Sequence, residues 1–249
     1  MRQRMGPLFS TMVQDFFSRR LINEKNVSAR TVASYRDTFR LLLRYALAQK
    51  KKAPHDLAVA DLDAPFVLGF LNHLERTRGN SARTRNSRLA AIRSFMKYVS
   101  FCDPMAIAVV QRVLAIPLKR FERPLLGFLS RAEMDAILAA PDASHWSGRR
   151  DQMLLRTMYN TGARVSEITA LRADDVSFGD RAFIRIVGKG RKERTIPLWR
   201  STRDGLKDWL SHLRQDGGGP LFANRKGEHL SRSGGEARLR VAVRAAKKT

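Results

Sequence analysis

Residues 158–168, MYNTGARVSEI, and residues 188–194, GKGRKER, carry the decisive information in this 249-residue chain. In the first stretch, Thr161-Gly162 is expected to end one helix, because glycine commonly follows the last helical turn. A second helix then begins at Arg164. The second stretch lies between two short strand candidates, so Gly188-Lys189-Gly190 is expected to form a hairpin turn. The sequence therefore predicts an arginine on a helix and a lysine on a β-turn within one domain.

The elements around these two stretches predict a mixed helical and β second half. Ser130 and Glu133 have the spacing of a capping box that starts a helix. Residues 182–187 alternate as a half-buried strand should, with Ile184 and Ile186 on the inner face. The remaining predicted elements are helices over 149–159, 164–171 and 202–213, strands over 175–178 and 193–198, a brief extended piece at Leu221-Phe222, and a basic helix from Ser231 or Ser233.

The first hundred residues predict a compact bundle of helices. Apolar side chains recur at helical spacing in each segment, beginning with Met12, Phe16, Phe17 and Leu21. Further helices are expected from Ser28, over 65–78, from Ser81 and over 105–114. The helix from Ser81 has an apolar face containing Phe95, and its opposite flank offers Arg83, Arg85 and Arg88. The predicted fold class is therefore mainly α, with a small antiparallel sheet in the second of two domains.

The charge of the chain indicates a polyanionic partner. The chain has 47 Lys and Arg against 23 Asp and Glu, a net charge of +24, and the excess is 12 both before and after Leu118. Such an even spread favours two halves that both face a nucleic acid backbone, although solvated surface arginines are an alternative explanation. Cys102 is the only cysteine, so an intramolecular disulfide is excluded. With no long apolar run and no signal core, a soluble cytoplasmic protein is expected.

Three residues suit phosphodiester chemistry. The fork of Arg164 could bind non-bridging phosphate oxygens through charge-assisted hydrogen bonds, and Lys189 could supply a proton to the leaving oxygen. Glu167 follows Arg164 by three residues, so it lies on the same helical face and could hold the guanidinium. Taken singly, each motif is more typical of solvated surface residues, and only their combination favours a site.

A connector divides the two predicted domains. Residues 115–129 contain Pro117, Pro124 and a charged run, with little periodicity. We expect a helical DNA-binding domain over 1–116, a linker over 117–128 and a second domain over 129–249. A tether of this kind would let two domains grip one ligand, although composition alone fits an ordinary exposed loop equally well.

Three segments together resemble one known family. TGARVSEI at 161–168, LRADDV at 171–176 and GKGRKERTIPL at 188–198 closely resemble the tyrosine recombinase (phage integrase) family in order and spacing. Weaker similarity covers nearly the whole chain. It includes residues 31–35, the helix at 81–99, the connector, and residues 221–232.

The resemblance implies a C-shaped clamp on double-stranded DNA that cuts one strand with a tyrosine and needs neither metal nor cofactor. It implies that Arg164 is the first catalytic arginine, Lys189 the general acid and Glu167 the supporting carboxylate. Members act as tetramers on DNA, whereas a monomer is expected for this chain. The residues expected to contact DNA are Arg83, Arg85, Arg88, Arg191, Lys192 and Arg194.

Part of the family pattern has no counterpart in these residues. The family continues with a His-x-x-Arg element and a nucleophilic tyrosine, and none of Tyr35, Tyr45, Tyr98 and Tyr159 has a suitable place. His229 and Arg232 have the His-x-x-Arg spacing but lie where the family has a turn. We therefore expect a C-terminally truncated recombinase that is inert on its own. The alternatives are a non-catalytic protein that competes for recombination sites, or a basic RNA-binding protein.

Overall fold

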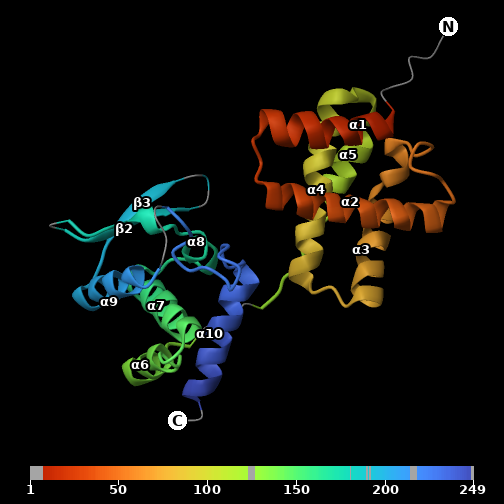
Figure 1. Ribbon diagram of the computed structural model, residues 1–249. Coiled ribbons are helices and arrows are strands. Elements are labelled where there is room, and N and C mark those ends of the chain that lie inside the picture. The colour runs from red at the N-terminus through yellow and green to blue at the C-terminus, as the bar shows by residue number, and fades with distance from the viewer. Residues whose placement is uncertain are drawn as a thin grey trace, which may run out of the picture. The chain divides into compact units, whose positions relative to one another are not determined.

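The computed structural model describes residues 8–122, 127–179, 181–188, 190, 192–213 and 218–247. The chain divides into two compact units, Met1–Leu125 and Leu126–Thr249, each with its own hydrophobic core (Figure 1). The first is helical, and the second combines helices with a three-stranded antiparallel sheet. The predicted fold class, mainly α with a small antiparallel sheet, is confirmed.

The first unit consists of helices that begin where the sequence supplies a cap. Ser28, Asp63 and Ser81 each accept a hydrogen bond from the backbone N–H three residues later, which satisfies a free donor of the first turn. The elements are α1 (Phe9–Asp15), the π-helix η1 (Phe16–Glu24), α2 (Ala29–Lys50), the 3₁₀ turn η2 (Val59–Leu62), α3 (Ala64–Arg78), α4 (Ala82–Cys102), the 3₁₀ turn η3 (Pro104–Ala106) and α5 (Ile107–Leu114).

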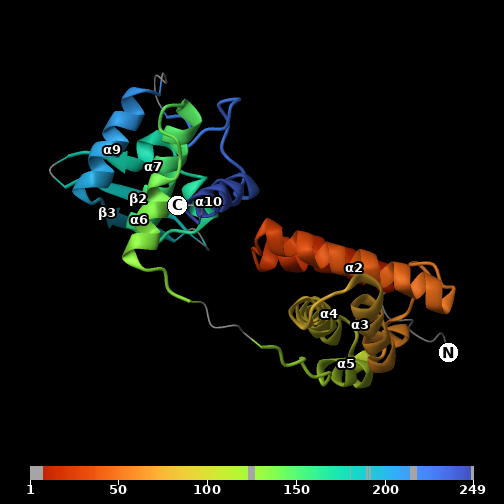
Figure 2. The same ribbon diagram turned by 90° about the horizontal axis from the view of Figure 1, so that it is seen from below.

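Helix α4 is central to the first unit, where it packs against α1, α2, α3 and α5. Figure 1 shows α1 and α2 lying across α3, α4 and α5, and Figure 2 shows α2 beside α3 and α4 from below. Phe95 of α4 is fully buried, and its ring lies 5.2–5.8 Å from the ring centroids of Phe9, Phe16 and Phe39. This aromatic cluster packs α1, η1 and α2 against α4, which lies far from them in the sequence.

The first helical segment differs from regular α-helix. Met12, Phe16 and Leu21 are buried as predicted, but α1 ends at Asp15 and continues as the π-helix η1. Phe16 and Leu21 are five residues apart, which matches the i to i+5 repeat of a π-helix. The wider turn thus keeps both side chains in the core.

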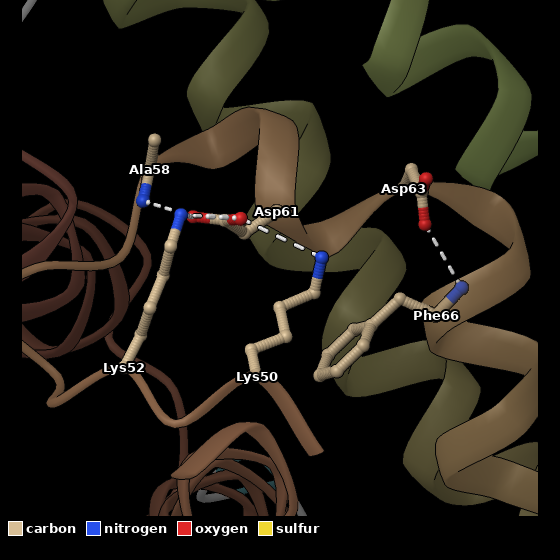
Figure 3. Close-up of polar contacts among 6 residues, drawn as sticks. All are labelled: Lys50, Lys52, Ala58, Asp61, Asp63 and Phe66. Atoms are coloured by element: carbon tan, nitrogen blue, oxygen red, sulfur yellow. Dashed lines mark hydrogen bonds and ion pairs between the residues drawn. The ribbon is translucent and has the colours of Figure 1, made fainter.

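A carboxylate closes the loop between α2 and η2. Asp61, in η2 directly after this loop, is 13% exposed and accepts hydrogen bonds from the Lys52 ammonium at 2.8 Å and from the Ala58 N–H at 3.0 Å (Figure 3). Lys50 lies 3.5 Å from the same carboxylate. Burial raises the pKa of Asp61, but the Ala58 N–H and the two lysines outweigh it and hold the pKa below its ordinary 3.8. The ionised carboxylate therefore stabilises the fold above that pH.

Replacing Asp61 by alanine is expected to lower the free energy of unfolding of the first unit by about 1–3 kcal/mol, the range for hydrogen bonds to charged groups. Denaturant unfolding followed by far-UV circular dichroism measures this change at pH 7. The difference from the parent chain should shrink as the pH falls through 3.8, because protonation removes the same interactions. Asp56→Ala is the matched control, since Asp56 lies in the same loop with its side chain 60% exposed. An equal loss in both variants would contradict the assigned role.

The beginning of the predicted connector is attached to the first unit. Asn86 of α4 pairs with the backbone of Lys119, donating to its carbonyl at 2.8 Å and accepting from its N–H at 3.0 Å. The Lys119 ammonium donates to both oxygens of Glu75 on α3, at 3.0 and 2.8 Å. The chain is therefore held against α3 and α4 as far as Lys119, and the domain boundaries stay a prediction.

The second unit places a small sheet beside its helices. Its strands β1 (Val176–Ser177), β2 (Phe183–Val187) and β3 (Glu193–Pro197) pair antiparallel in that order, with Ile184 opposite Ile196. Ile184 and Ile186 are fully buried, and the three alternate residues of β2 are exposed, as the sequence predicts. The other elements are α6 (Arg131–Ala139), α7 (Trp146–Thr161), α8 (Val165–Ile168), the 3₁₀ turn η4 (Ala173–Asp175), α9 (Arg200–Ser211) and α10 (Arg232–Ala246).

Two predictions about this unit were wrong in detail. The helix expected over 164–171 is only the four residues of α8, because the chain turns away to bond with a distant segment. The Leu171 carbonyl accepts from the Leu221 N–H at 2.8 Å, and the Ala173 N–H donates to Gly219 at 2.9 Å. Leu221 and Phe222 are buried in a turn rather than extended, between the single β-bridges of Pro220 and Ala223.

Candidate phosphate-binding site

Arg164 stands at the N-terminus of α8. Gly162 ends α7 in the left-handed conformation, with a φ of +59°, and Arg164 follows with extended backbone as the residue before the first helical turn. Gly235 of α10 supports α8 from behind, because a Cβ there would lie 2.8–2.9 Å from Val165 and Thr169. The short helix is therefore fixed in place by α10.

Glu167 is the centre of the site. Its side chain is only 6% exposed, and it binds two arginines. One carboxylate oxygen, Oε2, accepts from the Arg194 guanidinium at 2.7 Å and from the Arg164 backbone N–H at 3.0 Å. The other, Oε1, accepts from Nη1 of Arg164 at 3.1 Å. The expected contact between Arg164 and Glu167 is present, and it arises from helix capping rather than from a shared helical face.

The surroundings of Glu167 keep it ionised. The hydrogen bond from Arg194 and those from the Arg164 backbone and side chain outweigh burial, and they lower the pKa of Glu167 from 4.5 to about 2. Because the pKa of the folded state lies below the ordinary value, this carboxylate contributes stability above pH 4.5. That contribution is lost as the pH falls from 4.5 through about 2. At neutral pH the site therefore holds one buried negative charge between two positive ones.

The base of the β2–β3 hairpin lies against this carboxylate. The Gly188 N–H donates to the Lys192 carbonyl at 2.8 Å, which closes the turn. A Cβ on Gly188 would lie 3.1 Å from Nη1 of Arg194 and 3.3 Å from Oε1 of Glu167, so a larger residue would press on both charged groups. Lys189 and Arg191, predicted as general acid and DNA contact, lie outside the described residues. Gly188, the described residue before Lys189, lies beside Glu167 at the base of the turn.

The Arg164 side chain is available to a ligand. It is 74% exposed, and within the described ranges its only side-chain partner is Oε1 of Glu167, through Nη1. Nε and Nη2 remain open, which is the pair of donors that binds two oxygens of a phosphate. Lys192, also predicted to contact DNA, is exposed on the same hairpin. The site can therefore bind an oxyanion through a guanidinium whose base is fixed.

The three arginines predicted on the DNA-facing flank of α4 have different surroundings. Arg83 is exposed, as expected. Arg85 is not: it is 4% exposed, lies 3.6 Å from Glu75, and its Nε and Nη1 have no hydrogen-bond partner. Arg88 is 13% exposed and donates to Asp37 of α2 at 2.9 Å. The expectation of an exposed position was wrong for Arg85, because α4 is surrounded by other helices and only part of its circumference reaches solvent.

The four tyrosines make other contacts in the part of the chain that the structure describes. Tyr35 and Tyr45 pack against phenylalanines of the first unit. Burial and the neighbouring Cys102 raise the pKa of Tyr98 to about 12, which disfavours the phenolate. Tyr159 makes an edge contact with Trp199, with 5.3 Å between ring centroids.

The His-x-x-Arg pair at 229 and 232 makes local contacts. Nδ1 of His229 lies 3.1 Å from the Thr169 carbonyl, and Arg232 forms an ion pair with Glu236 one turn along α10. These contacts agree with the interpretation of ordinary polar positions.

Comparison with known proteins identifies the family. The phage integrase family matches residues 127–249, and the SAM-like N-terminal domain of phage integrases matches residues 14–100. The integrase/recombinase y4rD of Sinorhizobium fredii is 38% identical over 95% of this chain and 85% of its own length. The tyrosine recombinase XerC of Pelotomaculum thermopropionicum is 31% identical, over 85% of this chain and 70% of its own length. The chain belongs to the phage integrase family of tyrosine recombinases.

A further relative is longer than this chain. The integrase/recombinase y4rC of Sinorhizobium fredii is 48% identical over 88% of this chain, and the match spans 66% of the length of y4rC. The chain thus spans about two thirds of this relative.

Solved structures share the fold at low sequence identity. XerH bound to its difH substrate matches 96% of this chain and 69% of the XerH chain, with a TM-score of 0.64 and 20% identity. The Tn1549 transposon integrase in complex with circular intermediate DNA matches 97% of this chain and 80% of its own, with a TM-score of 0.66 and 14% identity. Within the described residues, no helix is both long and apolar enough to span a membrane.

Proposed function

We propose that this chain is the DNA-binding and phosphate-anchoring part of a site-specific recombinase, which exchanges DNA strands by the tyrosine recombinase mechanism. The observation that carries the proposal is the Arg164–Glu167–Arg194 array at the positions of the family motif. Its exposed guanidinium sits on a buried support that is ionised at neutral pH, and such a fixed donor can stabilise charge that develops on phosphate. The proposed organisation is a core-binding domain over 1–116, a connector over 117–128 and a partial catalytic domain over 129–249.

The proposed chemistry gives each residue one role. Arg164 binds the non-bridging oxygens of the scissile phosphate, and Glu167 holds Arg164. Lys189, on the hairpin turn, donates the proton to the leaving oxygen. The nucleophile of the reaction is a tyrosine, and none of the four tyrosines of these residues is assigned that role. Double-stranded DNA is the proposed partner, and the lambda integrase tetramer bound to a Holliday junction supports assembly of the complete recombinase on DNA.

A suicide substrate tests whether this chain binds DNA without cleaving it. A nicked duplex traps the phosphotyrosyl intermediate of this reaction as a covalent protein–DNA adduct, visible on a denaturing gel. We expect this chain to bind the duplex, with affinity that falls steeply as salt rises, and to form no adduct. A covalent adduct would show that one of the four tyrosines is the nucleophile. A failure to bind DNA at low salt would reject the proposed function.

Arg83 and Arg85 are expected to affect different properties. Arg83→Ala should reduce the slope of log affinity against log salt by about 0.9, the loss of one phosphate contact, and leave stability unchanged. Arg85→Ala should lower the free energy of unfolding of the first unit by about 1–3 kcal/mol, because a buried side chain and its contact with Glu75 are lost. Fluorescence anisotropy of a labelled duplex and denaturant unfolding measure the two effects. An unchanged salt slope for Arg83→Ala would remove this residue from the DNA interface.

A second function is a non-catalytic protein that occupies recombination sites. The surroundings of the tyrosines favour it, since three belong to the first unit and the fourth, Tyr159, packs edge-on against Trp199. Competition tests whether the chain can serve this second function: added in excess, it should displace a complete family member from its DNA site without cutting it. In this function Arg164 and Lys189 act only as phosphate-binding residues.

A further inference from the structure

Arg194 and Arg164 compete for one carboxylate. A guanidinium pairs most strongly with a carboxylate through two parallel hydrogen bonds, one to each oxygen. Arg164 makes only one such side-chain bond, from Nη1 to Oε1 of Glu167 at 3.1 Å. The second oxygen, Oε2, is already bound by Arg194 at 2.7 Å and by the Arg164 backbone N–H at 3.0 Å. Arg164 therefore cannot close its fork on Glu167 while Arg194 is in place.

The open fork matters for function. Among the described residues, Nε and Nη2 of Arg164 have no hydrogen-bond partner, so both can donate to an external acceptor, and the side chain is 74% exposed. If Arg194 were absent, both oxygens of the ionised Glu167 could accept hydrogen bonds from the guanidinium of Arg164. The expected result is a closed Arg164–Glu167 pair whose donors are turned away from solvent and partly neutralised. An internal carboxylate would then compete with a phosphate for the same donors.

We propose that Arg194 is a positioning residue: it holds the second oxygen of Glu167 and so keeps the Arg164 fork open for a DNA phosphate. The inference rests on the proposed function and assigns Arg194 a role different from the direct DNA contact that the sequence predicts. The position of Arg194 agrees with this role, because its side chain is 39% exposed and its guanidinium points at a buried group.

The same contact links the hairpin to α8. Arg194 lies on β3 opposite Ile186, and Gly188 at the base of the turn is close to both Arg194 and Glu167. Glu167 thus joins the strand that leads out of the hairpin turn to the helix that begins at Arg164. Movement of the hairpin away from α8 would release Oε2, so an intact hairpin is a condition for the open fork.

A double-mutant cycle on this chain tests the inference. Fluorescence anisotropy measures the affinity for a labelled DNA duplex of mixed sequence, for the parent chain, Arg164→Ala, Arg194→Ala and the double variant. Each single substitution should weaken binding by about three- to tenfold, the worth of one solvent-exposed hydrogen bond. The double variant should bind no more weakly than Arg164→Ala, because Arg194 acts only through Arg164.

Two further variants control for charge and for folding. Arg185→Ala is the matched control, since Arg185 lies on the same sheet in an ion pair with Asp175 and away from Glu167. Carboxyl ¹³C NMR should show the pKa of Glu167 rising from about 2 toward 4.5 in Arg194→Ala and staying low in Arg185→Ala. Arg194→Lys keeps a cation beside Oε2, so its affinity should stay within twofold of the parent chain. If the alanine variant fails to fold, Arg194→Met takes its place in the cycle, because methionine keeps a long aliphatic side chain and removes the donors to Glu167.

The outcomes separate the inference from the proposed function. If the two single losses multiply in the double variant, Arg194 contacts DNA independently and the positioning role is rejected, while the Arg164 site stands. If the pKa of Glu167 rises but affinity does not change, the positioning role is also rejected. If Arg164→Ala itself binds DNA as tightly as the parent chain, the proposed phosphate site fails, and the inference fails with it.

Discussion

Replacing Arg164 by alanine is expected to reduce strand cleavage about 10²–10³-fold, the loss typical for removing one fixed donor from a developing oxyanion. Cleavage requires a nucleophile, so the measurement uses this chain completed with the downstream part of y4rC, the longer relative at 48% identity. The readout is the rate of covalent adduct formation on a nicked duplex. Duplex affinity should fall far less, because Arg164 makes one of many phosphate contacts.

The matched control for this experiment is Arg185→Ala in the same chimera. Arg185 is an exposed arginine of the same unit, paired with Asp175, and its loss should leave the cleavage rate within about threefold of the parent. Cleavage that survives Arg164→Ala would show that the guanidinium does not act on the scissile phosphate. Parent and variant adducts must both be compared at saturating protein, so that only the chemical step differs.

Replacing Phe95 by alanine is expected to lower the free energy of unfolding of the first unit by about 3–5 kcal/mol, the usual cost of a large cavity in a core. Phe95 is fully buried and contacts three other rings, so few neighbours can move into the space it leaves. Denaturant unfolding followed by far-UV circular dichroism measures the loss.

Tryptophan fluorescence gives an internal control. The only tryptophans of the chain, Trp146, Trp199 and Trp209, all belong to the second unit. Because each unit has its own core, Phe95→Ala should shift the dichroism transition and leave the fluorescence transition in place. Leu154→Ala, in the core of the second unit, should shift the fluorescence transition. A common shift of both signals in Phe95→Ala would show that the two units unfold together.

Local signals in the sequence were sufficient for most elements of the fold. Ser28, Ser81 and Ser130 each cap the helix that was predicted to follow them, and Gly162 ends α7 in the conformation that glycine favours. The alternation in β2 also predicts which side chains are buried. These features depend on residues within one or two turns of each other. The π-helix η1 and the early end of α8 depend on packing against distant segments, which local periodicity does not report.

The residues of the candidate site also fall into those that local sequence predicts and those that depend on distant contacts. The motif identified Arg164 and Glu167, because three residues and a helix start are enough to bring them together. The third member, Arg194, was predicted only as a DNA contact. It lies 27 residues from Glu167 in the sequence, and the pairing of β3 with β2 brings the two side chains together. Arg85, which was predicted on the basic flank of α4, is buried for a similar reason. Its burial depends on the helices that surround α4, which are distant in the sequence.

The family was indicated by a resemblance to known members. Residue type and short spacing were enough to predict the mainly helical fold class, the basic character and the arginine–glutamate pair. The folded chain was needed to show that Glu167 is buried between two guanidiniums, and that Arg164 keeps an open fork while Arg85 is enclosed. Burial and the sharing of one carboxylate depend on contacts between segments far apart in the chain, so no local pattern encodes them.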